Sequence, residues 1–455
     1  EEICYYFKIY NEKGLLGESQ LINFFTENLR PPQVEFIEAG VANGQVSLKW
    51  QPFVGNYFSH YKVTVRNYKG GSGYAYQEYP VAIIEEKEIT DFIDETPPRL
   101  KNPVYAIYVY DIFGNVSSDF TAEKNSRELN WTHPEVLDLE MIKFAVPAPN
   151  SSEIFIYGRL ATGEYQLIRY NYNDHAISAT ANKPPQASTS VQMQVHNSGE
   201  TGRELFYAQG NALAVYDASD LTYKYALELK NSPMFFDFAY LGNNIFAFTD
   251  SQTLYTYKRT NGSMEFISKK AHFTTHYGNT SYHLLPLKNG EILVGHYQEP
   301  KSYKFTINGS GEISDGELVN IPITSRWQKK TLYSPDVNYV INLPDNKLFS
   351  TLTWNWQETF ETPYFPSGIS RDGNLILGTK NDPQENITNE SIQERKAKIY
   401  NLTTKKATTL ATKGYPHLLF ENHLGQIISI SSGFKRESLE SSTPKPDIFV
   451  EVMGY

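Results

Sequence analysis

Residues 240–260 read YLGNNIFAFTDSQTLYTYKRT and show the unit that recurs through the second part of the chain. The polar turn Gly242-Asn243-Asn244 precedes an apolar run that begins at Ile245. A second apolar run, Leu254–Tyr257, follows after another polar turn. Asn and Gly tolerate the positive φ angles that tight hairpins require. The segment therefore predicts two antiparallel strands joined by a short turn.

Similar strand pairs recur from residue 131 to residue 455. Seven apolar runs follow polar turns at a mean spacing of about 45 residues, within the range of propeller blades. They begin at Ile154, Leu205, Ile245, Ile292, Val340, Leu375 and Ile427. The pattern resembles divergent β-propellers in general and predicts seven blades over 131–455. We expect the run Ile448–Val450 to pair with sequence near 131–147, because ring closure removes exposed sheet edges.

Residues 33–127 show a different, shorter β pattern. Apolar and polar residues alternate around Val46, Leu48 and Trp50, and turn residues recur every 8–12 positions. Such spacing is typical of an antiparallel sandwich. The segment resembles a fibronectin type III domain in three motifs: Leu48-x-Trp50-x-Pro52, Phe58-x-x-Tyr61-x-Val63, and Tyr105-x-Ile107-x-Val109-x-Asp111 followed by Phe113-Gly114. The predicted fold class is thus all-β, a fibronectin type III-like sandwich plus a seven-bladed β-propeller.

Residues 1–30 repeat part of that module. Tyr5, Phe7, Ile9 and Asn11 alternate before Gly14, as Tyr105, Ile107, Val109 and Asp111 do before Gly114. A lone hairpin is marginally stable in water. We therefore expect residues 1–30 to be the C-terminal part of an upstream fibronectin-like module.

Composition narrows the classes of partner. The chain has 41 Lys and Arg against 51 Asp and Glu, a net charge of −10, which argues against nucleic acid. Its single cysteine, Cys4, cannot form an intrachain disulfide. An apolar run of membrane-spanning length is absent from the sequence, so we expect membrane association only through a lipid anchor or a partner.

The domain order gives a second resemblance. A fibronectin-like module before a divergent propeller, in a Tyr- and Asn-rich chain with one Cys, is similar to surface-exposed lipoproteins of Bacteroidota-type bacteria. That resemblance implies an extracytoplasmic location at the bacterial cell surface or outer membrane. It also implies partners among other proteins of a surface complex, with glycan as a further class.

Catalytic motifs are absent from the sequence. It has neither the G-x-S-x-G elbow of hydrolases nor a P-loop, and turn residues account for its many Asp side chains. His272, His276 and His283 are the candidates for a metal site, but their spacing matches no known ligand motif. We therefore expect no metal, no cofactor and no enzymatic activity.

Aromatic residues make the better functional candidates. Five of them gather between the fifth and sixth predicted blades: Trp327, Trp354, Trp356, Tyr364 and Phe365. Exposed aromatic rings stack on sugar faces or anchor protein interfaces. The sequence therefore predicts an extracytoplasmic binding or scaffold protein, an accessory subunit of an outer-membrane surface complex that contacts protein or glycan. The alternative is a propeller enzyme, a polysaccharide lyase or glycosidase.

Overall fold

The computed structural model of the chain describes most residues between 2 and 454. The described residues are 2–25, 30–66, 77–117, 124–185, 193–198, 202–229, 235, 237–273, 282–296, 299–323, 332–333, 338–342, 347–359, 365–379, 394–436, 439 and 446–454. Within these ranges the protein is built from β-strands, with one short 3-10 turn at Lys288–Gly290 and no α-helix. Accordingly, this part of the chain holds no helix of membrane-spanning length and apolarity.

The chain divides into two compact units. One contains Glu1–Pro97 and Asn102–Trp131, and the other contains Pro98–Lys101 and Thr132–Tyr455. The short segment Pro98–Lys101 thus belongs to the second unit although sandwich strands flank it in sequence. Leu100 is buried there, and Arg99 forms an ion pair with Glu135 at 3.2 Å.

The first unit contains two antiparallel sheets packed face to face. One sheet has the order β5-β6-β9, and the other has the order β11-β10-β7-β8. Their bounds are β5 (Phe36–Ala42), β6 (Gln45–Trp50), β7 (Phe58–Arg66), β8 (Glu78–Ile84), β9 (Asp91–Asp94), β10 (Val104–Asp111) and β11 (Ser126–Glu128). Trp50 of one sheet packs edge-on against Tyr61 of the other, with ring centroids 5.4 Å apart. The buried Tyr105 hydroxyl donates a hydrogen bond to Asp94 Oδ2 at 2.7 Å.

The same unit also contains a hairpin near the N-terminus. It consists of β1 (Glu2–Tyr5), β2 (Lys8–Asn11), β3 (Gly14–Glu18) and β4 (Ile22–Phe25). β1 pairs with β4 and β2 pairs with β3, both antiparallel. Unlike the sandwich strands, β2 and β3 are exposed along their whole length.

The second unit contains seven successive antiparallel sheets among its described residues. The first sheet contains β12 (Met141–Pro147), β13 (Glu153–Arg159), β14 (Tyr165–Asn171) and β15 (Ala176–Thr180). The second sheet contains β16 (Met193–Ser198), β17 (Gly202–Gln209), β18 (Ala212–Asp217) and β19 (Tyr223–Glu228). The third sheet contains β20 (Asp237–Gly242), β21 (Ile245–Thr249), β22 (Thr253–Thr260) and β23 (Ser263–Ala271). The next two contain β24 (Tyr282–Pro286), β25 (Glu291–His296), β26 (Ser302–Thr306) and β27 (Glu317–Val319); and β28 (Leu332–Tyr333), β29 (Tyr339–Asn342), β30 (Lys347–Ser350) and β31 (Asn355–Thr359). The last two contain β32 (Phe365–Ile369), β33 (Leu375–Thr379), β34 (Lys396–Asn401) and β35 (Lys406–Ala411); and β36 (Tyr415–Glu421), β37 (Ile427–Ser432) and β38 (Ile448–Met453).

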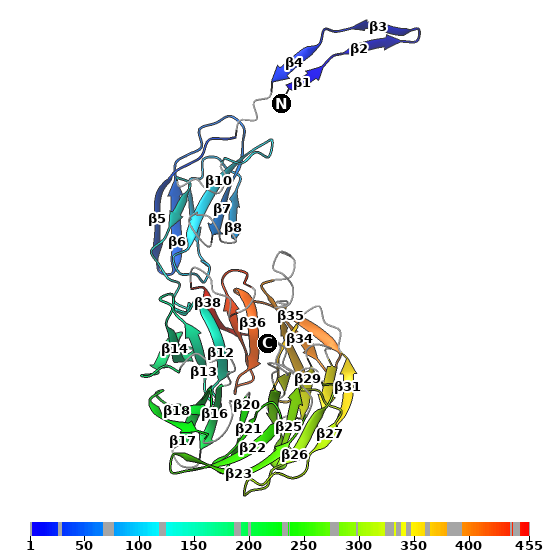
Figure 1. Cartoon of the computed structure of the whole chain (residues 1–455). Coiled ribbons are helices and arrows are strands. Elements are labelled where there is room, and N and C mark those ends of the chain that lie inside the picture. Colours follow the sequence, from blue (N-terminus) through cyan, green and yellow to red (C-terminus); the bar gives the residue numbers. More distant parts are fainter. Residues whose placement is uncertain are drawn as a thin grey trace. The chain divides into compact units, whose positions relative to one another are not determined.

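These sheets are the blades of a β-propeller (Figure 1). The first strands of neighbouring sheets lie beside one another, as β12 does with β16 and β20 with β24. Each of the seven predicted apolar runs lies in the second strand of its sheet, so the sequence period marks the blades correctly.

The ring closes between its two ends. The last sheet has three strands, and Val136 forms an antiparallel bridge with Phe449 beside them. The Leu137 N–H donates to the Ile448 carbonyl at 2.8 Å. This pairing confirms the expected closure and covers the outer edge of β38.

Apolar clusters between neighbouring blades form the core of the propeller. Phe206 and Phe246, for example, belong to successive sheets and share one such cluster. A fully buried ion pair joins the same two blades, with Arg259 Nη1 2.6 Å from Glu204 Oε2. Asn244 Oδ1 accepts a further hydrogen bond from Arg259 at 2.7 Å, so the buried charges are well satisfied.

Candidate functional site

A surface pocket of about 540 Å³ lies at the edge of the first blade. Its lining comes from β13, from β14 and the turn before it, and from β15 and the segment after it. The lining residues are Tyr157, Gly163, Glu164, Tyr165, Gln166, Thr180, Ala181, Pro184 and Pro185. The turn between a blade's second and third strands lies on the same propeller face as the connection to the next blade. The pocket therefore opens on that face.

The turn on one side of the pocket has a defined backbone. Leu160 N–H donates to the Glu164 carbonyl at 2.8 Å, and Gly163 N–H donates to the Leu160 carbonyl at 2.9 Å. Gly163 adopts a φ of +88°, which glycine reaches without strain. This turn sets Glu164 and Tyr165 at the start of β14, directly beside the pocket.

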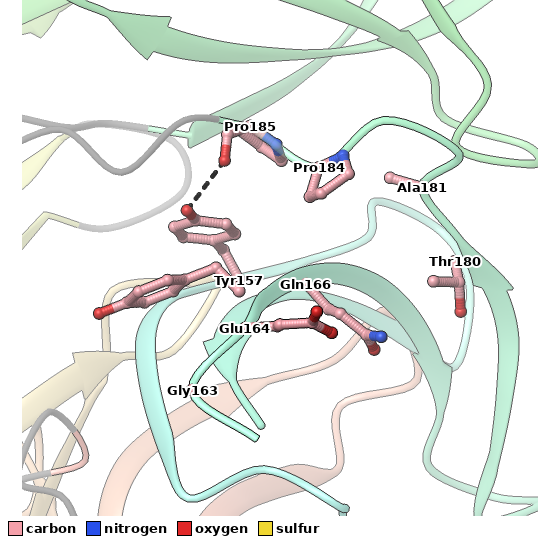
Figure 2. A pocket seen from close by; sticks show the side chains of 9 residues that line it. Tyr157, Gly163, Glu164, Gln166, Thr180, Ala181, Pro184 and Pro185 are labelled. Carbon is pink, nitrogen blue, oxygen red and sulfur yellow. Dashed lines mark hydrogen bonds between the residues drawn. The ribbon is translucent and has the colours of Figure 1, made fainter. Parts of the chain in front are cut away.

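Buried tyrosines hold the opposite wall. Figure 2 shows the Tyr157 hydroxyl directed at the Pro185 carbonyl, to which it donates at 3.0 Å. The Tyr216 hydroxyl of the second blade donates to the Lys183 carbonyl at 2.9 Å. Asn182 Oδ1 accepts the Tyr223 N–H at 3.0 Å. Residues 181–185 are thus fixed to two blades.

Stacked aromatic rings form the floor. Tyr165 is half-buried and stacks on the buried Tyr157, with centroids 5.4 Å apart and an interplanar angle of 24°. Tyr207 packs edge-on against Tyr157 at 4.9 Å. The ammonium of Lys143 lies 5.2 Å from the centre of the Tyr165 ring. This arrangement holds Tyr165 in one orientation at the pocket.

Few groups in this pocket can transfer protons. Among the described lining residues Glu164 is the single carboxylate, and the other polar side chains are Gln166, Thr180 and the tyrosines. Burial raises the pKa of the Tyr157 hydroxyl, so it remains a protonated donor near neutral pH. The site can therefore stack on a flat apolar face and exchange hydrogen bonds around it.

The predicted aromatic cluster is described only in part. Trp327 and Tyr364 lie outside the described residues, and the side chains of Trp356 and Phe365 are likewise outside them. The backbone of Trp356 lies in β31 opposite Phe349, and Phe365 begins β32. Trp354 is half-buried against the core cluster of the fourth and fifth blades, with Lys304 Nζ 4.6 Å from its ring centre. The cluster stays a prediction, and Trp354 contributes to packing between blades.

The two described candidate histidines, His272 and His283, form different contacts. His272 is buried, its Nε2 lies 2.9 Å from Thr249 Oγ1, and burial lowers its pKa to about 4. His283 Nδ1 lies 3.6 Å from Asp237 Oδ2, which accepts the Leu284 N–H. His276 lies outside the described residues. Among those that are described, no three His, Cys, Asp or Glu side chains are placed to hold a metal ion.

Two further histidines lie on the first strands of their blades, and sequence reasoning did not single them out. His196 on β16 contacts Gln194 Oε1 at 2.9 Å, and burial lowers its pKa to about 4. His417 on β36 contacts Ser432 Oγ at 2.9 Å, and burial, with a smaller effect from Arg436, lowers its pKa to about 3. Both imidazoles are half-buried, remain neutral near pH 7 and form hydrogen bonds within their blades.

Comparison with known proteins adds a general likeness in fold. No family model matches the chain, and neither does any curated protein. Dihydro-heme d1 dehydrogenase NirN in complex with DHE is similar over 66% of this chain and 65% of its own, at 11% identity and a TM-score of 0.42. The WD40 propeller domain of Doa1 is similar over 65% of this chain and 92% of its own, at 10% identity and a TM-score of 0.38.

A third structure, the Neurospora crassa Pan2 WD40 domain, shows the same level of similarity. It covers 53% of this chain and 72% of its own, at 13% identity and a TM-score of 0.37. The identification of the propeller therefore rests on the strand pairing and the ring closure described above.

Sequence reasoning missed the tyrosine pocket. Its lining residues lie in three segments between positions 157 and 185, and neighbouring segments of a β-rich chain always contain some tyrosines. The available signal was the run Gly163-Glu164-Tyr165-Gln166, where a turn meets an aromatic residue flanked by polar side chains. The wall that ends at Pro185 is held by Tyr157 of the first blade and, at Lys183, by Tyr216 of the second blade, which are contacts that a sequence pattern does not show.

Proposed function

We propose that this chain is a non-enzymatic binding protein whose propeller holds a neutral glycan segment in the tyrosine pocket. The observation behind the proposal is the half-buried Tyr165 ring, stacked on Tyr157 within the pocket. A pyranose ring presents an apolar C–H face that stacks on such a ring, and hydroxyls at its rim. Gln166, Thr180 and Glu164 supply hydrogen-bonding groups for those hydroxyls.

The pocket supports binding over catalysis. A glycosidase needs two carboxyl groups about 5–10 Å apart across the substrate, whereas the part of the lining that the structure describes contains one carboxylate. The walls are also fixed by buried tyrosine hydroxyls, which favours recognition of a rigid ligand without closure of a lid.

Two other parts of the chain support an accessory role. The order of strands β5-β6-β9 and β11-β10-β7-β8 supports the fibronectin type III-like assignment of residues 33–127, a module that spaces or presents neighbouring domains. We propose that the protein belongs to a bacterial outer-membrane surface complex, because a fibronectin-like module before a propeller, in a Tyr- and Asn-rich chain with one cysteine, resembles surface-exposed lipoproteins. Protease accessibility on intact cells of the source organism tests this location, and a protein cleaved only after lysis contradicts it.

The binding proposal is tested with two tyrosine variants. Tyr165→Ala removes the stacking platform, and Tyr57→Ala removes an exposed tyrosine that packs against Phe113 in the other unit. Neutral polysaccharides are screened by affinity electrophoresis, and a ligand found there is measured by calorimetry. We expect Tyr165→Ala to weaken binding about tenfold or more and Tyr57→Ala to leave it unchanged.

Two outcomes would contradict the proposal. One is equal binding by Tyr165→Ala and the unmodified protein. The other is the release of new reducing ends or unsaturated uronic acid products from the bound polysaccharide, which would establish glycosidase or lyase activity instead.

A further inference from the structure

The tyrosine pocket lies where the outer strand of the first blade ends early. The ladder between β14 and β15 reaches only to the pair of Ile168 and Thr180. One further bond follows, in which the Ala181 N–H donates to the Leu167 carbonyl at 2.9 Å. β14 itself begins at Tyr165, so its start extends past the end of that ladder. Within the described residues, no strand pairs with this part of β14 on the side of β15.

The backbone of Tyr165 is directed to that uncovered edge. On the other side, β14 pairs with β13, and the Leu160 N–H donates to the Glu164 carbonyl at 2.8 Å. Successive residues of a strand direct their backbone groups to opposite sides. Leu167, two residues after Tyr165, accepts from Ala181 on the side of β15. The N–H and the carbonyl of Tyr165 therefore face the same side, towards the pocket.

Side chains add further groups around this edge. The half-buried Tyr165 ring stacks on Tyr157 with centroids 5.4 Å apart. Glu164 and Gln166, on either side of Tyr165 in sequence, also line the pocket, opposite Pro185 in Figure 2. An aromatic face, a backbone donor and acceptor, and two polar side chains thus lie within three consecutive residues.

We propose that this edge makes the pocket selective for a neutral pyranose with two adjacent free hydroxyls, an inference that rests on the proposed glycan binding. A hydroxyl both donates and accepts hydrogen bonds. One hydroxyl of the pair accepts the Tyr165 N–H, and its neighbour donates to the Tyr165 carbonyl. Both bonds form together, because adjacent hydroxyls of a pyranose are spaced much like the N–H and carbonyl of one extended residue. The Glu164 carboxylate accepts a further hydroxyl in a charge-assisted bond.

The length of the edge favours a sugar over a peptide. An extended peptide adds to a sheet through several successive residues, whose backbone bonds provide the affinity. Here the turn at Gly163 limits the edge at one end, and the bond from Ala181 limits it at the other. Between them, Tyr165 alone among the described residues directs backbone groups to this side. A pair of hydroxyls matches so short an edge.

The test uses the intact protein and the methyl glycosides of glucose, galactose and mannose. Each sugar is compared with its 2-deoxy, 3-deoxy and 4-deoxy analogues. Saturation-transfer NMR measures binding, and hydrogen exchange reports on the Tyr165 amide. Glu164→Ala removes the side-chain acceptor, and Glu312→Ala is the matched control, because it removes an exposed carboxylate from the fourth blade.

We expect at least one of the three glycosides to bind and to slow exchange of the Tyr165 amide. Loss of a hydroxyl at two adjacent positions should weaken binding about fivefold or more, because a backbone group in the pocket then loses its partner. Loss of the hydroxyl at the remaining position should have a smaller effect. Glu164→Ala should weaken binding about threefold or more, and Glu312→Ala should leave it unchanged.

Four results would overturn the proposal. The first is the absence of binding by all three glycosides, and the second is equal binding of each parent sugar and all its deoxy analogues. The third is an equal effect of Glu164→Ala and Glu312→Ala. The fourth is protection of the Tyr165 amide by tri-alanine but by no glycoside, which would assign the edge to a peptide.

The proposed glycan binding is judged by a separate result. If a polysaccharide binds the unmodified protein and Tyr165→Ala weakens that binding, the pocket is a glycan site even when the deoxy analogues bind as the parent sugars do. In that case only the selectivity for adjacent hydroxyls is wrong. If neither polysaccharides nor glycosides bind, both proposals are wrong.

Discussion

Individual polar residues inside the propeller form hydrogen bonds that their positions in the sequence do not reveal. The sequence does not single out His417, which lies between Pro416 and the apolar run Leu418–Phe420. In the structure it contacts Ser432 Oγ, which itself donates to the Phe434 carbonyl at 2.6 Å. The serine therefore accepts the Nε2–H of a neutral imidazole.

This histidine predicts a pH dependence of stability. Burial, together with Arg436, lowers the pKa of His417 to about 3, against 6.5 for an ordinary histidine. Between these two pH values the unfolded chain binds a proton that the folded protein does not bind, so stability falls as pH decreases from 6.5 towards 3. Because of this histidine, the free energy of unfolding should be about 2 kcal/mol lower at pH 5 than at pH 7.

Denaturant unfolding at pH 7 and pH 5 measures the effect. His417→Gln keeps a donor for Ser432 but cannot titrate, so its loss of stability between the two pH values should be smaller by about that 2 kcal/mol. An identical loss in both proteins would show that His417 is accessible to protons when folded.

Elements of the fold were predictable to the extent that they are buried. The second strand of every blade is apolar and emerged from the sequence period, as with Ile245–Thr249, in which every residue is buried. The outermost strands did not emerge, because their side chains are mostly exposed and polar. Lys406–Ala411 is an example. The pocket was equally hidden, because its walls come from separate segments that only the fold brings together, as Tyr157 and Pro185 show.

The turns between strands provide a prediction at this scale. Gly290 joins β24 to β25 with a φ of +76°, and an added Cβ would lie 2.4 Å from the Ile307 carbonyl oxygen. Gly290→Ala should therefore lower the free energy of unfolding by about 1–3 kcal/mol through backbone strain and this clash. Gly309→Ala is the matched control, because an added Cβ there meets nothing within 4 Å. Chemical denaturation of both variants measures the difference, and equal stabilities would refute the strained turn.

At the scale of the whole molecule, the propeller depends on pairing between distant parts of the chain. The predicted ring of seven blades and its closure near residues 131–147 agree with the observed bridge between Val136 and Phe449. The predicted domain limits at 1–30, 33–127 and 131–455 stay predictions. Sequence patterns reveal that a ring exists because each blade repeats the same pattern of buried apolar residues. They do not show which side chains meet between blades.

Closure can be tested at Leu137. Leu137→Pro removes the N–H that donates to Ile448 and should destabilise the propeller by about 3 kcal/mol or more. Leu137→Met keeps both the N–H and a buried apolar side chain, and should cost less than about 1.5 kcal/mol. Thermal unfolding followed by tryptophan fluorescence compares the two variants, and similar melting temperatures would contradict a stabilising role for this hydrogen bond.

The bridge between Val136 and Phe449 also has a consequence for biosynthesis. The ribosome translates residue 136 long before the closing strand β38. The edge of the first blade therefore stays uncovered until translation of the propeller is nearly complete. Premature termination or slow elongation would leave open rings with unpaired strands, the form in which aggregation and capture by chaperones are expected.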